Sequence, residues 1–398
     1  MVREADEEEA MLPNGVADRR TSSSPSICFP PCGRSSLLIG NAFDLIVVQN
    51  EHEFAAGDAI FWFGVKFLKI GACDSGGSRI VLEVAQGKRS AVRFPIVHQK
   101  IQEPEPPLEY HPSDGAIVAK NRKTRLSTNA ARTEHDPTAL SQLANLLESG
   151  VNSARYLLLD GDDYVLGVAP VNVFLWSTRD RLLVVDIDGT ITRSNLRGVI
   201  DTILTEQYTY CHDGVCQFLS SIENVRMLYL TSRPIGIANT TRKFLSQLRQ
   251  AQSHQLPGGP LLGFTGSMAK VLLMELVSKS VHEFKREALT TNVVRPFLQL
   301  GVRNVFLAGF GNSLMDMQAY HGAGMQMHQI YLVDKRSRIY CLDCKANREP
   351  LRNQDYMHAR GTLFEGYQDS KLMAHILGQA LIETFDTKPK LAASLKIV

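Results

Sequence analysis

The spacing of apolar positions along the chain changes near residue 181. Before that point, short apolar runs bounded by Gly, Asp and Pro predict β-strands. These runs cover residues 43–48, 60–70, 80–84, 91–97, 155–159 and 171–176, with a short one near 164–168. Strands at this rhythm are typical of a β-sandwich or a small barrel.

After residue 181, apolar strands alternate with helices, which predicts an α/β fold with a parallel sheet. The strands are expected at residues 182–186, 226–231, 260–264, 304–308 and 329–333. The helices are expected at residues 200–207, 214–221, 236–250, 269–278 and 286–300, with a last one at 371–385. The apolar runs suit strands that are covered on both faces.

Pro, Ser and charged residues mark the segments between these units. We expect a disordered leader over residues 1–36 and a largely disordered linker over 99–154, with a short helix at 139–147. A basic cluster at residues 120–125 is expected to bind anionic membranes, and a nuclear import signal or a solvated loop are the alternatives. The chain then divides into residues 1–36, 37–98, 99–154, 155–178, 179–370 and 371–398.

Composition excludes several classes of protein. The 398 residues contain 43 Lys and Arg against 41 Asp and Glu, so a globally basic nucleic-acid binder is excluded and no direct nucleic-acid binding is expected. No apolar run approaches the roughly 18 to 20 residues that cross a bilayer. The 7 cysteines are an odd number and thinly spread, which indicates reduced thiols in the cytoplasm or nucleus.

The sharpest chemical signal is a pair of aspartates at the end of an apolar strand. The strand at residues 182–186 ends on Asp186, and Asp188, Gly189 and Thr190 follow it. Ligands of open α/β sheets bind beyond the carboxyl ends of strands. Two carboxylates there can divide the roles of nucleophile and general acid/base. An Asp-rich turn without chemistry is the alternative.

Other polar residues recur later in the chain. Thr231 and Ser232 end the next strand and offer hydroxyls to a phosphate, with a helix cap as the alternative. Lys285 opens a predicted helix and can neutralise phosphate charge, with a solvated lysine as the alternative. Asn312 and Asp316 follow the fourth apolar strand and offer oxygen ligands to Mg²⁺, with turn chemistry as the alternative for Asn312.

In this order the motifs resemble those of the haloacid dehalogenase superfamily of aspartate-nucleophile phosphotransferases. Within that superfamily the chain resembles the lipin family, in a catalytic signature and in an N-terminal conserved segment. The matching segments are residues 186–195, 229–236, 256–262, 309–312, 317–320 and 363–367, and then 43–48 and 63–71. Asn195 stands where lipins usually have Asp, and the acidic start differs from the usual amphipathic helix.

The resemblance implies a Mg²⁺-dependent phosphatidate phosphatase of phospholipid and triacylglycerol synthesis, which makes diacylglycerol and phosphate. It implies Asp186 as the nucleophile that forms an aspartyl-phosphate, and Asp188 as the acid and then the base. The implied phosphate-binding residues are Gly189, Thr190, Thr231, Ser232 and Lys285, and the implied metal ligands are Asp186, Asp188, Asn312 and Asp316. For Arg233 a structural ion pair is favoured over a head-group contact.

The expected partner is phosphatidate in anionic membranes, and the expected location is cytoplasmic, peripherally on the endoplasmic reticulum or nuclear envelope, or nuclear. Two other classes stay open. A phosphatase for soluble phosphomonoesters or phosphoproteins would not need the β-rich N-terminal part. A non-catalytic phosphatidate-binding module would not need the intact pair Asp186 and Asp188.

The expected fold is a haloacid dehalogenase-like Rossmannoid catalytic domain without a large cap. Only about 40 residues separate Thr190 from Thr231, and predicted core elements fill them. The catalytic domain is joined to an immunoglobulin-like β-sandwich split in sequence between residues 37–98 and 155–178. Such a sandwich needs roughly seven strands, which neither segment supplies alone.

If the β-rich part is split in this way, a chain that starts at Arg181 loses the strands that pack beside the catalytic strand. We therefore expect the fragment 181–398 to be insoluble or inactive after expression. A soluble and fully active fragment would show instead that the sandwich is an independent module.

Overall fold

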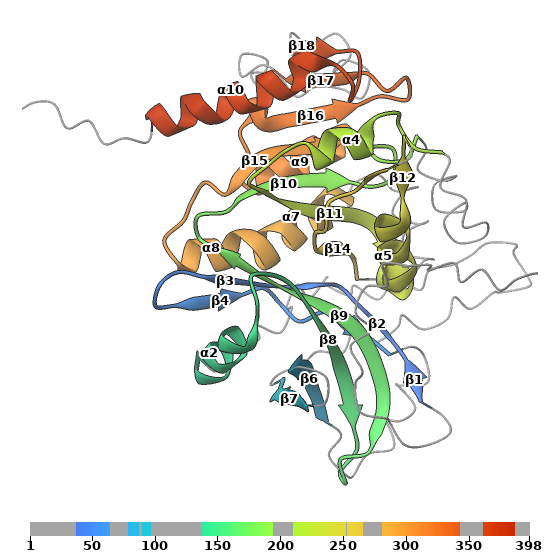
Figure 1. Cartoon of the computed structure of the whole chain (residues 1–398), viewed down its shortest axis with the longest axis vertical. Coiled ribbons are helices and arrows are strands. Elements are labelled where there is room, and N and C mark those ends of the chain that lie inside the picture. The colour runs from blue at the N-terminus through green and yellow to red at the C-terminus, as the bar shows by residue number, and fades with distance from the viewer. Residues whose placement is uncertain are drawn as a thin grey trace, which may run out of the picture.

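The computed structural model describes residues 37–63, 79–86, 90–96, 137–193, 210–251, 253–265, 281–342 and 361–386. These residues form two units that lie against each other (Figure 1). We call the unit before residue 178 the β lobe, and the unit from residue 181 onward the α/β lobe.

The β lobe combines strands from both sides of the predicted linker. β3 (Leu45–Gln49) pairs in parallel with β9 (Val165–Ser177), and β6 (Arg79–Gln86) pairs antiparallel with β8 (Gly150–Leu159). The sheet order is β4-β3-β9-β8-β6-β7, and β1 also pairs with β9. The remaining elements are β1 (Leu38–Ile39), β4 (Phe54–Ala56), β7 (Ser90–Pro95), the pair β2 (Asn41–Ala42) and β5 (Phe61–Trp62), and α2 (Pro137–Leu146).

This pairing agrees with a β unit that is divided in sequence. The strands form one seven-stranded sheet beside a two-stranded one, so the immunoglobulin-like arrangement stays a prediction. The helix at 139–147 is confirmed as α2, and its Leu140 and Leu143 pack in one apolar cluster with Tyr156 and Leu158 of β8. The end of the expected linker is wrong, because β8 already begins at Gly150.

A single long strand, β9, replaces the two strands expected near 164–168 and 171–176. Pro170 in its middle argues for a break, because proline has no N–H to give to a ladder. Pro170 lies where β9 is flanked by neither β1 nor β3, so no donor is needed there. The next N–H on the same edge of β9, that of Asn172, donates to the carboxylate of Asp44 at 3.0 Å.

The α/β lobe is built on a sheet with the strand order β14-β11-β10-β15-β16-β17-β18, which Figure 1 shows from one edge of the sheet to the other. The strands from β14 to β16 are parallel, whereas β17 and β18 are antiparallel additions. The bounds are β10 (Arg181–Asp186), β11 (Val225–Pro234), β14 (Leu261–Phe264), β15 (Phe306–Gly311), β16 (Ile330–Val333), β17 (Ile339–Leu342) and β18 (Gly361–Phe364). The five predicted strands are confirmed, and the two antiparallel ones were not predicted.

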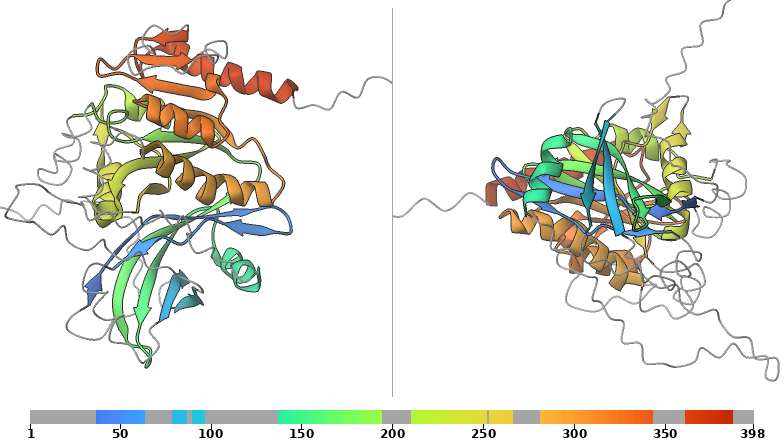
Figure 2. Two further views of the ribbon diagram at one scale, coloured as in Figure 1. Left: turned by 180° about the vertical axis from the view of Figure 1, so that it is seen from behind. Right: turned by 90° about the horizontal axis from the view of Figure 1, so that it is seen from below.

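Helices pack on this sheet, with α7, α8 and α9 over one face (Figure 2, left). The helices are α4 (Val215–Ser220), α5 (Ala238–Gln247), α7 (Val281–Leu289), α8 (Arg295–Gln299), α9 (Leu314–Gly322) and α10 (Ser370–Asp386). Short elements are the 3₁₀ turns η1 (Ile235–Ile237) and η3 (Met327–Gln329), the π-helical turn η2 (Thr290–Val294), and the ribbon of β12 (Arg249–Gln250) and β13 (His254–Gln255).

The helix expected at 286–300 begins earlier than predicted. α7 starts at Val281, so Lys285 lies within a helix and does not open one. The helix starts earlier because Phe284 packs edge-on against Phe264 of β14, at 5.2 Å between ring centroids. The apolar spacing within residues 286–300 gives no information about this contact with a distant strand.

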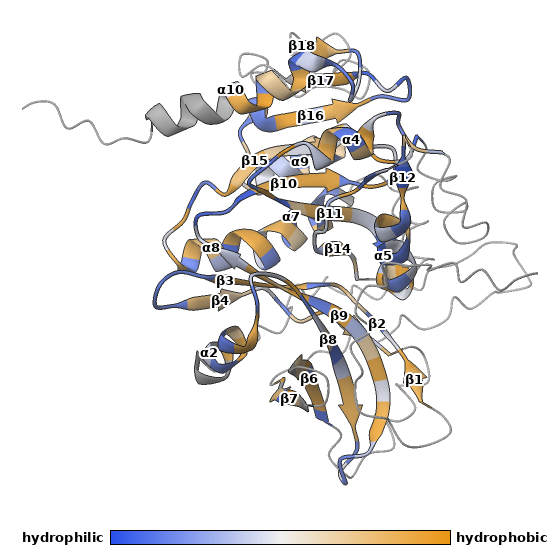
Figure 3. Ribbon diagram, viewed as in Figure 1, coloured by the Kyte–Doolittle hydropathy of each residue, from blue (hydrophilic) through white to orange (hydrophobic). Residues whose placement is uncertain are grey.

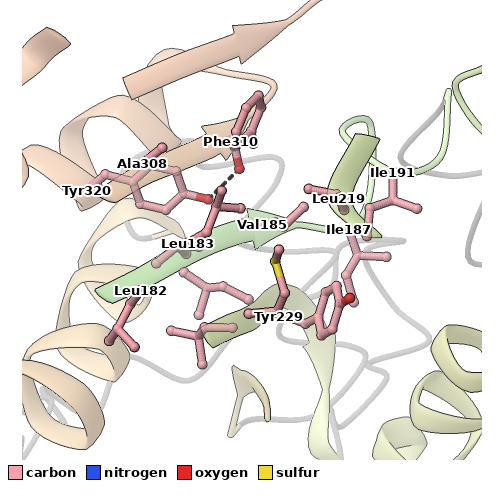
Figure 4. Packing of buried hydrophobic residues seen from close by; sticks show 14 of the residues in the cluster. Leu182, Leu183, Val185, Ile187, Ile191, Leu219, Tyr229, Ala308, Phe310 and Tyr320 are labelled. Carbon is pink, nitrogen blue, oxygen red and sulfur yellow. Dashed lines mark hydrogen bonds between the residues drawn. The ribbon is translucent and has the colours of Figure 1, made fainter. Parts of the chain in front are cut away.

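The central strand β10 is apolar between its charged end residues, in contrast to the mixed β8 (Figure 3). Leu182, Leu183 and Val185 are fully buried between helices and neighbouring strands (Figure 4). In the same cluster the hydroxyl of Tyr320 donates to the carbonyl of Phe310 at 2.8 Å. This core holds the end of β10 in a fixed place, which is where the two predicted carboxylates follow.

Several predictions fall outside the described residues. They concern the leader 1–36, the basic cluster 120–125, the helices at 200–207 and 269–278, most of the strand at 60–70, and Asn195. The segments that separate the first motifs include 194–209 and 266–280, so the absence of a large cap stays a prediction. Among the described helices, none combines the length and the apolar character that a bilayer crossing requires.

A buried carboxylate, that of Asp44, joins the two lobes. It accepts the backbone N–H of Leu261 at 2.8 Å, that of Asn172 at 3.0 Å, and Nε of Arg242 on α5 at 2.9 Å. Apolar side chains continue the contact, because Ile46 and Trp176 of the β lobe belong to the core cluster of the α/β lobe. The two lobes therefore share one core cluster, beside the β lobe's own, and an ion pair with a buried carboxylate.

We predict that Asp44→Ala lowers the free energy of unfolding by about 3–5 kcal/mol, because two backbone N–H groups and Nε of the partly buried Arg242 lose their acceptor. Urea unfolding followed by circular dichroism measures this loss. Asp163→Asn is the matched control, since it removes the charge from an exposed pair with Arg79 that is worth at most about 1 kcal/mol, and Asn tolerates the φ of 65° at this residue. Equal losses in the two variants would contradict a junction held by Asp44.

Candidate active site

The candidate site lies on residues 186–192, which begin at the last residue of β10; we call them the catalytic loop after their predicted role. Gly189 has a φ of 91°, a left-handed conformation that lets the chain turn directly after Asp188. The backbone N–H of Thr192 donates to the carbonyl of Ile187 at 3.0 Å and closes the turn. The sequence Asp-Gly-Thr therefore places two carboxylates at one end of the sheet.

Asp186 is held by an ammonium group and a hydroxyl. Nζ of Lys285 donates to Asp186 Oδ1 at 2.7 Å and to Asp316 Oδ1 at 2.5 Å. The hydroxyl of Thr190 donates to Asp186 Oδ2 at 3.0 Å. The three charged side chains are at most 4% exposed, so this triad is almost free of solvent.

Burial and charge shift the pKa values of the triad in different directions. Burial raises the pKa of Asp186 to about 7; Lys285 opposes this rise, while Asp316 and Asp188 add to it. Burial also acts to raise the pKa of Asp316, but Lys285 and several hydrogen bonds outweigh it and the pKa is lowered. For Lys285, burial acts to lower the pKa, but Asp186 and Asp316 outweigh it, so the pKa is raised and the ammonium stays charged.

The carboxylate of Asp188 is held by a different set of residues. Arg233 donates through Nη2 to Oδ1 at 2.7 Å and through Nε to Oδ2 at 3.0 Å. The hydroxyl of Thr231 donates to Oδ2 of Asp188 at 3.2 Å. Arg233 is 3% exposed and its guanidinium lies 5.4 Å from the centre of the Phe244 ring. This geometry agrees with the structural ion pair that the sequence favoured for Arg233.

The loop after β15 brings Asn312 to the same place. Its Nδ2 donates to the backbone carbonyl of Asp188 at 3.0 Å. Asp316 orders this loop, because its Oδ2 accepts the N–H groups of Asn312 and Ser313 at 3.0 and 3.1 Å. Gly311 is required here, since a Cβ added to it would lie 2.4 Å from the Cβ of Asp316.

These donors fit a hard divalent cation. The Asp186 carboxylate, the Asp188 carbonyl and the Asn312 amide offer oxygen atoms, which Mg²⁺ prefers. The raised pKa of Asp186 reflects burial and neighbouring negative charge, which a cation would offset. Within the described ranges no cluster of three or more His, Cys, Asp or Glu side chains suits a metal, so the fit rests on this mixed oxygen set.

The predicted site residues lie together, but several make contacts that were not expected. Thr231, predicted to bind phosphate, donates to Asp188, and Thr190 donates to Asp186. The N–H of Gly189 donates to the hydroxyl of Thr192 at 3.2 Å. Ser232 is partly buried on β11, next to these residues in sequence. Their phosphate-binding roles stay predictions.

Sequence reasoning assigned no role to His212 and Tyr367, which both contact the catalytic loop. His212 Nε2 lies 3.3 Å from the carbonyl of Gly189, and the Tyr367 hydroxyl donates to the carbonyl of Thr190 at 3.0 Å. Tyr367 lies in the segment 363–367, which was singled out without a function. A lone histidine before a helix carries no comparable signal.

Comparison with known proteins gives a family. The model of LNS2 (Lipin/Ned1/Smp2) matches residues 134–358. The chain is similar to nuclear elongation and deformation protein 1 of Schizosaccharomyces pombe, with 28% identity over 198 residues that cover 49% of this chain and 28% of the relative. It is similar to phosphatidate phosphatase LPIN1 of Homo sapiens, with 31% identity over 179 residues, 44% of this chain and 19% of the relative.

A third relative is phosphatidic acid phosphohydrolase 1 of Saccharomyces cerevisiae, with 28% identity over 189 residues that cover 45% of this chain and 21% of the relative. The match therefore spans less than a third of the length of each of these relatives.

The raised pKa of Asp186 predicts a pH dependence of stability in metal-free protein. Folded Asp186 keeps its proton up to about pH 7, whereas its ordinary pKa is 3.8, so the unfolded chain binds fewer protons between these values. The free energy of unfolding should therefore fall as pH rises through this window, by up to about 1.4 kcal/mol per pH unit from this group.

Urea unfolding in chelator at pH 4 to 7 measures this slope. Asp186→Asn cannot titrate, so the unfolding free energy of wild type minus that of the variant should fall steadily as pH rises. A difference that stays constant over the window would contradict the raised pKa.

Proposed function

Because the chain belongs to the LNS2 (Lipin/Ned1/Smp2) family, we propose that it is a Mg²⁺-dependent phosphatidate phosphatase. It hydrolyses phosphatidic acid to diacylglycerol and phosphate at a membrane surface. The observation that carries the proposal is the pair Asp186 and Asp188 at the carboxyl end of β10, with the buried Lys285 on the first carboxylate. A module that only binds phosphatidate would not need this pair.

In the first step a carboxylate oxygen of Asp186 attacks the phosphorus of the substrate. The new O–P bond forms as the bond from phosphorus to the glyceryl oxygen breaks, which gives an aspartyl-phosphate. Asp188 donates a proton to the leaving oxygen. Its carboxylate is tied to Arg233 and Thr231 in the free protein, so this step requires Asp188 to turn towards the substrate.

In the second step Asp188 takes a proton from water, which attacks the phosphorus of the aspartyl-phosphate. The O–P bond to Asp186 breaks, and phosphate leaves with the carboxylate restored. Lys285 offsets phosphate charge throughout, and Thr231 and Ser232 supply hydroxyls to its oxygens. Asp186, the Asp188 carbonyl and Asn312 would hold Mg²⁺, with Asp316 ordering that loop. The cation supplies positive charge that offsets repulsion between an anionic nucleophile and an anionic substrate.

The membrane part of the proposal rests on the expected shape of the chain. A catalytic domain without a large cap lets a lipid surface approach Asp186, and the basic cluster at 120–125 attracts anionic lipid. The β lobe, as a split immunoglobulin-like sandwich, holds the catalytic strand rigidly. We place the protein peripherally on the endoplasmic reticulum or nuclear envelope, and it acts on phosphatidate there.

We predict that the full chain releases phosphate from phosphatidate in mixed micelles with Mg²⁺, and that a soluble phosphomonoester is a much poorer substrate. Asp186→Asn should lower kcat by about three orders of magnitude or more, since no nucleophile remains. Asp188→Asn should lower it by about 100-fold or more. Chelator should have the same effect, and Ca²⁺ should restore little activity because it prefers a looser shell.

The matched control is Asp163→Asn, which removes a carboxylate from an exposed ion pair and should leave kcat unchanged. Near wild-type activity in Asp186→Asn would rule out the aspartyl-phosphate mechanism. Equal rates on the soluble phosphomonoester would favour the soluble-substrate alternative.

A further inference from the structure

Two neighbouring carbonyls of the catalytic loop are held by side chains from distant parts of the chain. His212, which precedes α4, places Nε2 at 3.3 Å from the carbonyl oxygen of Gly189. Tyr367, which follows β18, donates its hydroxyl to the carbonyl of Thr190 at 3.0 Å. His212 is fully buried and Tyr367 is 3% exposed, so both contacts are shielded from water.

The partners of His212 fix which ring nitrogen carries the proton. A carbonyl oxygen can only accept, so Nε2 of His212 donates to Gly189. Nδ1 then accepts from the hydroxyl of Ser337, at 2.8 Å. Burial lowers the pKa of His212, which agrees with a neutral ring. The ring therefore connects the catalytic loop to the turn that bears Ser337 through two hydrogen bonds.

That turn joins β16 to the antiparallel strand β17, and it is rigidly built. Ser337 has a φ of 68°, which is unusual for a residue with a side chain. Asp334 holds it there: its Oδ1 accepts the N–H groups of Arg336 and Arg338 at 2.8 and 2.9 Å. The N–H of Ser337 donates to the carbonyl of Asp334 at 2.9 Å.

The same turn also shapes the approach of Tyr367. Gly366 has a φ of 146°, and a Cβ added to it would lie 3.0 Å from the carbonyl oxygen of Ser337. The Tyr367 ring then packs against Phe218 and Phe310, at 5.5 and 5.9 Å between centroids. The segment 363–367 is thus fitted to the turn and to the loop at once.

We propose that His212 and Tyr367 are positioning residues that hold the catalytic loop for the reaction. The inference rests on the proposed function and deepens it. Gly189 gives the loop its turn but no rigidity, and the loop carries both Asp186 and Asp188. Small displacements of reacting groups lower the rate by large factors. Loss of a hydrogen bond that orients a site residue commonly lowers activity by about 10–100-fold.

The test removes one oxygen atom at a time. Tyr367→Phe keeps the ring and loses the bond to Thr190. Tyr229→Phe is the matched control, because its hydroxyl donates to the carbonyl of Pro257 at 2.7 Å, which is not part of the loop. We expect Tyr367→Phe to lower kcat about tenfold with an unchanged KM, and Tyr229→Phe to keep kcat, while both shift the unfolding midpoint similarly.

His212 gives an independent pair of variants. Gln keeps an N–H where Nε2 of His212 lies, whereas Leu keeps the volume without a donor. We expect His212→Gln to retain several times more activity than His212→Leu at a similar unfolding midpoint. Equal activities in these two variants, or equal kcat in Tyr367→Phe and Tyr229→Phe, would overturn the proposal.

Hydrogen exchange of the loop separates this inference from the proposed function. We expect amides of residues 187–192 to exchange faster in Tyr367→Phe than in Tyr229→Phe or wild type, in metal-free protein without substrate. If wild type released no phosphate from phosphatidate but this local difference appeared, the proposed function would fail and the holding of the loop would stand. Identical exchange in all three proteins would overturn it.

Discussion

The arrangement of the α/β lobe depends on one buried cation, the ammonium group of Lys285. It lies 2.7 Å from Asp186, the last residue of β10, and 2.5 Å from Asp316, in the first turn of the helix α9 that follows β15. Two carboxylates could not be buried so close together without it, because burial disfavours each charge and their repulsion adds to the cost. The ion pairs of Lys285 therefore fix the position of α7 over the sheet and hold Asp186 and Asp316 together.

The β lobe meets a different requirement, which is to fix the position of β10, the strand that leads into the catalytic loop. β10 pairs with β11 and β15, and Ile46 and Trp176 of the β lobe belong to the same core cluster as its buried side chains. Asp44 makes this contact specific, since its carboxylate binds β9, β14 and α5 together. Apolar packing alone would allow the lobes to slide, whereas a buried carboxylate with three donors accepts one arrangement.

Local sequence signals predicted the strand ends, because in an α/β protein an apolar run followed by Asp, Thr or Asn usually indicates a buried strand that ends at a ligand site. They could not predict contacts between distant elements. Nothing near Thr231 indicates that its hydroxyl reaches Asp188, and nothing near Pro170 indicates that neither β1 nor β3 flanks β9 at that residue. The antiparallel β17 and β18 escaped prediction for the same reason: their partner is the existing sheet edge, and their short runs carry no period of their own.

The charges at the site also bear on what it can bind. Three nearly buried carboxylates, Asp186, Asp188 and Asp316, face two buried cations, Lys285 and Arg233. When Asp186 gives up its proton, as it must to act as a nucleophile, the site has one negative charge in excess. A phosphate monoester adds up to about two more negative charges near neutral pH. Its binding is then unfavourable unless a further positive charge arrives, and the oxygen donors of Asp186, Asp188 and Asn312 are of the type that a divalent cation prefers. This charge count is consistent with the metal-dependent mechanism that we propose, in which Lys285 does not act alone.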